Sequence, residues 1–138
     1  MDGLTDYSHA IAALALYGML ALILNPVAGL TRARAGLEPG EMPSPDYNNR
    51  SYRVCRSYQN TVEMAGVFAV VVSAAIFAGV SPSLVNWLAS LSLLFRVVMI
   101  YVHIQGVGAP ENGARTIIFV LCWLCKLALA ILAAVAAF

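Results

Sequence analysis

Long uncharged stretches of apolar residues dominate the pattern of the chain. A helix needs about 20 predominantly apolar residues to cross a hydrocarbon core of about 30 Å. We predict membrane-spanning helices over residues 8–30, 56–79, 84–105 and 115–138. The second and third come from one uncharged stretch that Ser81-Pro82 divides, because serine at an N-cap followed by proline starts a new helix. The pattern therefore predicts an all-α integral membrane protein with a single four-helix domain over residues 1–138.

Residues 31–55 form the one substantial polar loop that we expect. Arginines crowd its two ends, whereas the turn near Pro82 has none. Because basic residues favour the cytoplasmic ends of spans, the loop is expected to face the cytoplasm, with both termini on the opposite side. Asp2 and Asp6 precede the first apolar run in place of a basic segment. This pattern favours a retained span, which Pro26 kinks or stops near its end, over a cleaved signal peptide.

Composition narrows the function classes. The chain is 61% hydrophobic and 11% charged, with a mean hydropathy of +0.80, which excludes an ordinary soluble domain with about 25% charged residues. A net charge of +1 argues against a nucleic-acid partner. The cysteines are odd in number, and Cys122 and Cys125 lie in an apolar helix without the strand-turn-helix context of a redox pair. We expect neither a structural disulfide nor a metal site.

A polar stripe opens the predicted second helix. Arg53, Arg56, Asn60 and Glu63 recur at helical spacing and therefore share one face. A charge within a span costs about 2.5–3.5 kcal/mol on insertion scales, so such residues usually face protein or a wet cavity and mark function. The alternative is that Arg53 and Arg56 are interfacial anchors, while Asn60 and Glu63 join neighbouring helices.

Four further polar residues lie in the later spans. Arg96 lies at a depth similar to that of Glu63, and we expect the two to pair. His103 shares nearly the same face and either lines a site or makes a structural hydrogen bond. Arg115 is either an interfacial anchor or a cation aimed into a site. Lys126 lies near the bilayer centre and needs an acidic or carbonyl partner, such as Glu63 of this or a neighbouring subunit, or a wet internal cavity.

Three segments carry a resemblance to a known family. They are R-S-Y-Q-N-T-V-E at residues 56–63, preceded by N-N-R-S-Y-R-V-C, L-F-R-V-V-M-I-Y-V-H-I at 94–104, and A-P-E-N-G-A-R at 109–115. Together with the four-span pattern, they resemble the MAPEG superfamily, the membrane-associated proteins in eicosanoid and glutathione metabolism. The resemblance covers essentially the whole chain. It implies a homotrimer of four-helix subunits, with glutathione sites between neighbouring subunits on the cytoplasmic side.

The resemblance also implies roles for individual residues. Arg115 would stabilise the glutathione thiolate, as a nearby cation lowers the pKa of a thiol. The residues implied to bind the rest of glutathione are Arg53, Arg56, Asn60, Glu63 and Arg96, with Arg34 or Arg32 as a further contributor. We add His103 to the candidate site because it shares nearly the same face as Arg96. Met99 and His103 replace residues that relatives usually carry after the third-helix arginine. Substrate detail therefore does not transfer from the family.

These observations predict a membrane-bound glutathione transferase or peroxidase, which activates the glutathione thiol for attack on a lipophilic electrophile or hydroperoxide. The alternative is a non-catalytic lipid-binding or scaffold protein of the same fold. Glutathione is expected as a co-substrate, with no metal, and the expected partners are further copies of the chain, membrane lipid and a lipophilic second substrate. The chain is most similar to short bacterial members, so we expect a bacterial inner membrane with the active site facing the cytoplasm.

Overall fold

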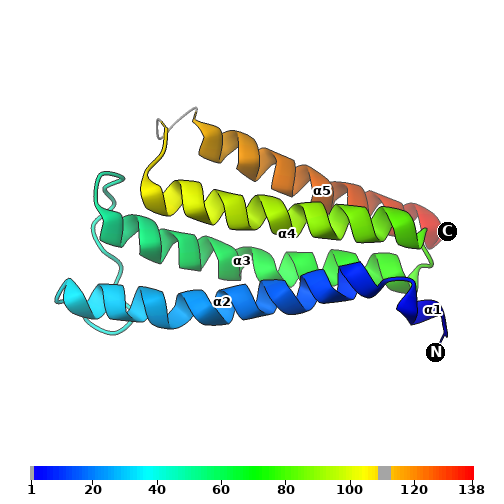
Figure 1. The fold of residues 1–138 in the computed structure, drawn as a ribbon, viewed down its shortest axis with the longest axis horizontal. Coiled ribbons are helices and arrows are strands. Elements are labelled where there is room, and N and C mark those ends of the chain that lie inside the picture. Colours follow the sequence, from blue (N-terminus) through cyan, green and yellow to red (C-terminus); the bar gives the residue numbers. More distant parts are fainter. Residues whose placement is uncertain (1, 109–112) are drawn as a thin grey trace.

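Four long helices lie side by side in an elongated bundle (Figure 1). This computed structural model describes residues 2–108 and 113–138. Its helices are α1 (Asp2–Thr5), α2 (Ser8–Arg34), α3 (Arg50–Phe77), α4 (Pro82–Gln105) and α5 (Ala114–Ala136). The four long helices are each long and apolar enough to cross a membrane. The predicted all-α membrane fold with four spans is confirmed, and the chain has the architecture of an integral multi-pass membrane protein.

Helices α2 and α3 extend further toward their connecting loop than the apolar pattern predicts. Helix α2 ends at Arg34 rather than near residue 30, and α3 begins at Arg50 rather than near residue 56. The Asn49 side chain caps α3 by accepting a hydrogen bond from Ser51 N at 2.9 Å. Pro26 neither stops α2 nor shortens it, since a membrane helix tolerates proline when nearby groups satisfy the freed carbonyl. Polar residues thus continue the helices past the apolar core.

Helices α3 and α4 form the centre of the bundle, and each contacts the other three long helices. Helices α2 and α5 lie on opposite sides of this central pair (Figure 1). The connections that follow α2 and α4 leave the bundle at one end, while both termini lie at the other. This arrangement matches the prediction that both termini lie on the side opposite the long loop. Of the A-P-E-N-G-A-R segment, residues 109–112 lie outside the described residues.

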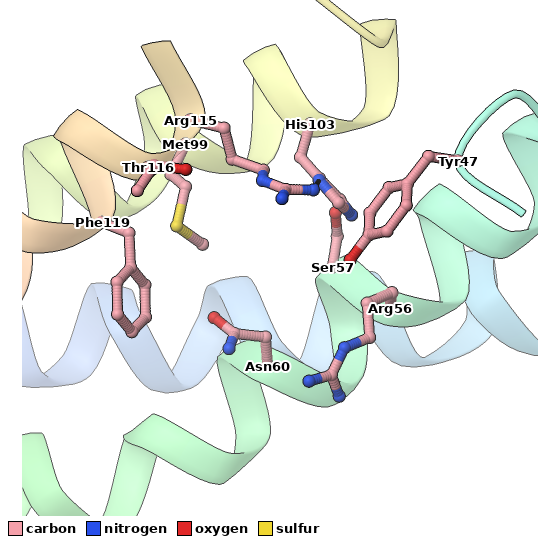
Figure 2. Close-up of a pocket in the computed structure, with 9 residues that line it drawn as sticks. All are labelled: Tyr47, Arg56, Ser57, Asn60, Met99, His103, Arg115, Thr116 and Phe119. Carbon is pink, nitrogen blue, oxygen red and sulfur yellow. Dashed lines mark hydrogen bonds between the residues drawn. The ribbon is translucent and has the colours of Figure 1, made fainter. Parts of the chain in front are cut away.

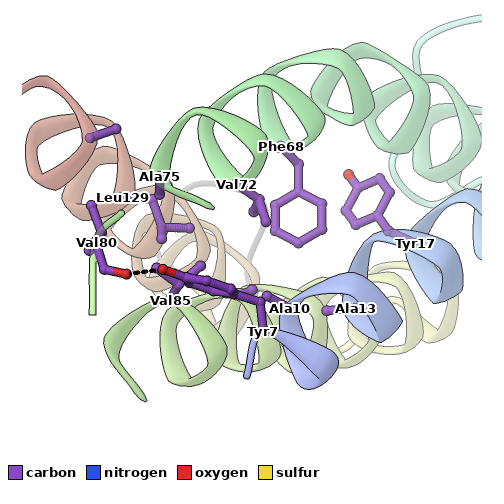
Figure 3. Packing of buried hydrophobic residues seen from close by; sticks show 12 residues of the cluster. Tyr7, Ala10, Ala13, Tyr17, Phe68, Val72, Ala75, Val80, Val85 and Leu129 are labelled. Atoms are coloured by element: carbon purple, nitrogen blue, oxygen red, sulfur yellow. Dashed lines mark hydrogen bonds between the residues drawn. The ribbon is translucent and has the colours of Figure 1, made fainter. Parts of the chain in front are cut away.

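Small side chains allow the helices to approach closely at the end of the bundle near the termini. Ala10, Ala75 and Ala89 are completely buried there, as expected for membrane helices, which associate through close backbone approach. The Tyr7 hydroxyl donates a hydrogen bond to Val80 O at 2.6 Å and ties the start of α2 to the turn before α4 (Figure 3). The other end of the bundle contains the polar residues.

Candidate functional site

A cavity of about 210 Å³ lies between α3, α4 and α5, at the end of the bundle where the loops connect. The lining side chains surround a common space (Figure 2). They are Tyr47, Arg56, Ser57, Asn60, Met99, His103, Arg115, Thr116 and Phe119. Of the predicted site residues, Arg56, Asn60, His103 and Arg115 therefore meet here. We call this cavity the loop-end pocket.

Arg115 lies in the first turn of α5 and contacts His103 and Tyr47. Its Nη1 lies 3.2 Å from His103 Nδ1, and its Cζ lies 4.6 Å from the ring centre of Tyr47. Because a guanidinium only donates hydrogen bonds, Nδ1 must accept, which places the imidazole proton on Nε2. That Nε2 is buried and has no hydrogen-bond partner in the described part of the chain. The pocket wall thus holds a cation in a defined position.

Arg56 and Asn60 come from successive turns of α3. Arg56 Nη1 lies 3.5 Å from Glu63 Oε1, and these two side chains are 36% and 47% exposed. Glu63 does not line the loop-end pocket but lies beside it, on the same exposed face of α3 as Arg56. The predicted ion pair between Glu63 and Arg96 is wrong. The two side chains point in different directions, since Glu63 is exposed at the surface while Arg96 is completely buried inside the bundle.

Arg96 lies behind the pocket rather than in its wall. Its Nη1 donates a hydrogen bond to Asn60 Oδ1 and also lies 3.9 Å from Met99 Sδ. Its Nε and Nη2 have no hydrogen-bond partner among the described residues, and its Cζ lies 5.9 Å from the ring centre of Tyr17. Arg96 therefore orients Asn60, which in turn reaches the pocket.

Arg53 joins the connection after α2 to the end of α4. Its Nη1 donates to Tyr47 O at 2.6 Å and Asn48 O at 3.0 Å, and its Nε donates to Ile104 O at 3.2 Å. Gly106 ends α4 with φ 70°, and a Cβ there would lie 3.0 Å from Arg53 Cζ. Arg53 does not line the loop-end pocket; it holds the backbone that carries Tyr47.

Arg34 lies away from the loop-end pocket. It lines a separate groove between α2 and α3, together with Arg50. Within one copy of the chain, the structure therefore brings together four of the eight predicted site residues. It places Arg96 and Glu63 next to that set, brings Arg53 to an adjoining pocket that His103 and Arg115 also line, and keeps Arg34 away from both.

Five pocket residues were not predicted from the sequence: Tyr47, Ser57, Met99, Thr116 and Phe119. The sequence could have indicated two of them as neighbours of the site, since Thr116 adjoins Arg115 and Phe119 lies one helical turn beyond it on the same face. Ser57 adjoins Arg56 but carries no charge or periodic signal. Tyr47 belongs to a loop whose position depends on its hydrogen bond with Arg53.

Lys126 has a different partner from the one predicted. It is 2% exposed, and its Nζ donates a hydrogen bond to Cys122 Sγ at 3.2 Å. Its Nζ also lies 5.9 Å from the ring centre of Tyr17 and 5.8 Å from that of Phe68. Within one copy of the chain, no described acidic or carbonyl group is its partner, and a thiol one turn earlier on α5 and two aromatic faces are within reach instead.

The fold and pocket together define a multi-pass membrane protein that presents arginines to a cavity between three of its helices. The chain belongs to the MAPEG family, whose family model matches residues 10–135. The matched region includes every residue of the loop-end pocket. Membership indicates a membrane protein related to glutathione or eicosanoid metabolism. No curated protein and no solved structure matches the chain.

Proposed function

We propose that this protein is a membrane-bound, glutathione-dependent enzyme that joins the glutathione sulfur to a lipophilic electrophile or uses it to reduce a lipophilic hydroperoxide. The observation that carries the proposal is the convergence of Arg56, Asn60, His103 and Arg115 on one cavity. No carboxylate is among the described residues that line it. Glutathione carries two carboxylates and a thiol, so a pocket with two guanidinium groups complements its charge.

The rim of the pocket supports the same assignment. Glutathione also carries an ammonium group, which requires an acceptor. Glu63 supplies that acceptor as a half-exposed carboxylate beside Arg56. The Asn60 amide, whose oxygen accepts a hydrogen bond from Arg96, retains its NH₂ group to donate to a carboxylate of glutathione. In the proposed complex, Arg56 binds a carboxylate of the tripeptide and Glu63 binds its ammonium group.

The size of the pocket supports assembly of several copies. Sites for ligands of drug-like size usually enclose about 300–1,000 Å³, whereas the loop-end pocket of one chain holds about 210 Å³. A second chain packed against this face would enlarge and close the site. We therefore include in the proposal a homotrimer with glutathione bound between neighbouring subunits, as the family resemblance implies.

Arg115 has the central chemical role in the proposal. A cation next to the sulfur lowers the pKa of the thiol, so the proton leaves to water and the nucleophilic thiolate remains. In the transferase reaction, the thiolate attacks an electrophilic carbon and forms a C–S bond, while the displaced electron pair moves to the leaving group or adjacent atom. His103 and Tyr47 hold the guanidinium in place for this step.

In the peroxidase reaction, the thiolate attacks a peroxide oxygen and the O–O bond breaks. The displaced alkoxide takes a proton from water and leaves as the alcohol. The sulfenic acid of glutathione then condenses with the thiol of a second glutathione to give the disulfide and water. Met99 and Phe119 provide the apolar part of the pocket wall, where a substrate dissolved in the bilayer can meet the thiolate. Arginines gather at this end of the bundle, so we place the site at the cytoplasmic face, with a bacterial inner membrane as the expected location.

Ultraviolet difference spectroscopy of the purified protein tests this proposal. Titration with glutathione near neutral pH is expected to give a saturable thiolate absorbance. Arg115→Ala should remove that signal and lower turnover by about 10²-fold, the usual effect of removing one group that stabilises developing negative charge. Arg50→Ala is the matched control, because it removes an arginine that does not line the pocket and has no implied role in glutathione binding.

Two results would count against the proposal. An undiminished thiolate signal in Arg115→Ala would remove Arg115 from the mechanism. Absence of any saturable signal in the unaltered protein, together with unchanged thermal stability on adding glutathione, would favour a non-catalytic lipid-binding or scaffold protein.

A further inference from the structure

A second hollow, distinct from the loop-end pocket, lies where α2 ends and α3 begins. It encloses about 480 Å³, and its chemistry changes along its length. Val27, Leu30 and Val54 form the part that is nearer the middle of the bundle, whereas Arg34 and Arg50 occupy the helix ends next to the loop. We call this hollow the α2–α3 groove.

The two arginines of the groove are not neutralised by any residue that the structure describes. Both are exposed, and neither guanidinium forms an ion pair or side-chain hydrogen bond with another described residue. Other arginines at this end are engaged: Arg53 with backbone carbonyls and Arg56 with Glu63. The α2–α3 groove therefore presents positive charge that is available to an external anion.

The order of groups in the groove matches the order of groups in a phospholipid. Helices α2 and α3 cross the membrane, so their last and first residues lie at the level of the lipid headgroups. Val27 and Leu30 are 42% and 59% exposed and offer apolar surface at the level of an acyl chain, while Arg34 and Arg50 lie at the level of a phosphate. A basic residue near an anionic membrane surface contributes about 1 kcal/mol.

From this complementarity, we infer that the α2–α3 groove binds an anionic phospholipid, with its phosphate between Arg34 and Arg50 and one acyl chain against the apolar wall. The site is separate from the loop-end pocket, with which it shares no residue. The inference therefore does not depend on glutathione binding. It gives the basic end of α2 a role other than the glutathione binding that the family resemblance implies for Arg34.

Lipid binding to the full chain in a neutral detergent tests this inference. The probes are phosphatidylglycerol and phosphatidylcholine with identical acyl chains, and glycerol phosphate as the headgroup without chains. Native mass spectrometry measures bound lipid, and thermal unfolding gives a second readout that needs no variant. We expect phosphatidylglycerol to bind more tightly than phosphatidylcholine and to raise the unfolding temperature more, and glycerol phosphate to bind much more weakly than either.

Variants locate the site. Arg34→Gln and Arg50→Gln should each weaken phosphatidylglycerol binding by about fivefold, the effect expected for one arginine at a charged surface. Arg32→Gln is the matched control, since it makes the same change in the same helical turn but outside the groove. Its affinity for phosphatidylglycerol should equal that of the unaltered protein.

Four results would overturn the inference. Equal binding of the two lipids would remove the role of headgroup charge, and an equal loss in Arg32→Gln would show that the charge acts diffusely. Binding of glycerol phosphate as tight as that of the lipid would indicate a soluble phosphate ligand. A change of oligomeric state in Arg34→Gln or in Leu30→Trp, which fills the groove, would show that a second copy of the chain occupies it.

Discussion

Replacing Asn60 with alanine tests the most unusual contact in the bundle. Arg96 is completely buried, and its one hydrogen bond to an oxygen atom among the described residues goes to Asn60 Oδ1. In Asn60→Ala, the guanidinium keeps the contact of its Nη1 with Met99 Sδ, at 3.9 Å, and the position of its Cζ 5.9 Å from the ring centre of Tyr17. A buried cation therefore loses its best acceptor.

The expected loss of stability follows from the charge of the donor. Hydrogen bonds between neutral groups within membranes average about 0.6 kcal/mol, because the unfolded helices also find partners. Hydrogen bonds to charged groups contribute about 1.5–3 kcal/mol, and loss of the partner leaves the donor buried and unsatisfied. We expect Asn60→Ala to lower the free energy of unfolding by about 2 kcal/mol, which is about 30-fold in the unfolding equilibrium.

The assay is unfolding in mixed micelles with an increasing fraction of denaturing detergent, followed by the helical circular dichroism signal. Gln59→Ala is the matched control, since Gln59 is the exposed amide adjacent to Asn60 on α3. Asn60→Asp should be at least as stable as the unaltered protein, because it retains an oxygen acceptor and adds a charge opposite to that of Arg96. If Asn60→Ala and Gln59→Ala unfold at the same detergent fraction, the bond between Arg96 and Asn60 does not stabilise the bundle.

Two further substitutions have predicted signs. Gly106→Ala should destabilise by about 1–2 kcal/mol through its left-handed backbone, with φ 70°, and further through the contact of 3.0 Å with Arg53. Gly79→Ala is the control, since Gly79 has φ 72° and a Cβ there would meet nothing within 4 Å. It should lower the free energy of unfolding only by the backbone contribution. Equal losses in the two variants would show that the contact with Arg53 does not contribute. Lys126→Met should stabilise by about 1 kcal/mol, because a buried amine whose hydrogen bond goes to the thiol of Cys122 costs more to desolvate than it gains. A less stable Lys126→Met variant would refute that balance.

The membrane fold could be predicted from the sequence because the bilayer leaves few choices. Hydrocarbon offers no partner for backbone N–H and C=O groups, so each sufficiently long apolar stretch must form a helix. The start of α4 at Pro82 was predicted for a similar local reason, since proline at the first helical position loses no hydrogen bond. The end of α2 at Arg34 and the start of α3 at Arg50 were not predicted, because polar residues also continue a helix once it leaves the hydrocarbon.

The candidate site could be predicted only in part. Helical spacing placed Arg56 and Asn60 on one face of α3, and the depth of Arg115 along α5 brought it to the same level. The contact of Tyr47 with Arg115 could not be predicted, because a loop residue has no periodicity and its position depends on Arg53. The pocket therefore combines a helix-borne part that the sequence indicates with a loop-borne part that it does not.

The sequence by itself determined that the chain forms membrane-spanning helices, where they cross, and which polar residues share a face and a depth. Only the tertiary structure decided which partner each buried charge meets. Arg96 pairs with Asn60 and not with Glu63, and Lys126 with Cys122. The physical reason is that periodicity defines the position of a side chain around its own helix, whereas a contact also depends on how neighbouring helices are rotated against each other. That rotation results from the packing of small residues such as Ala75 and Ala89 across the bundle.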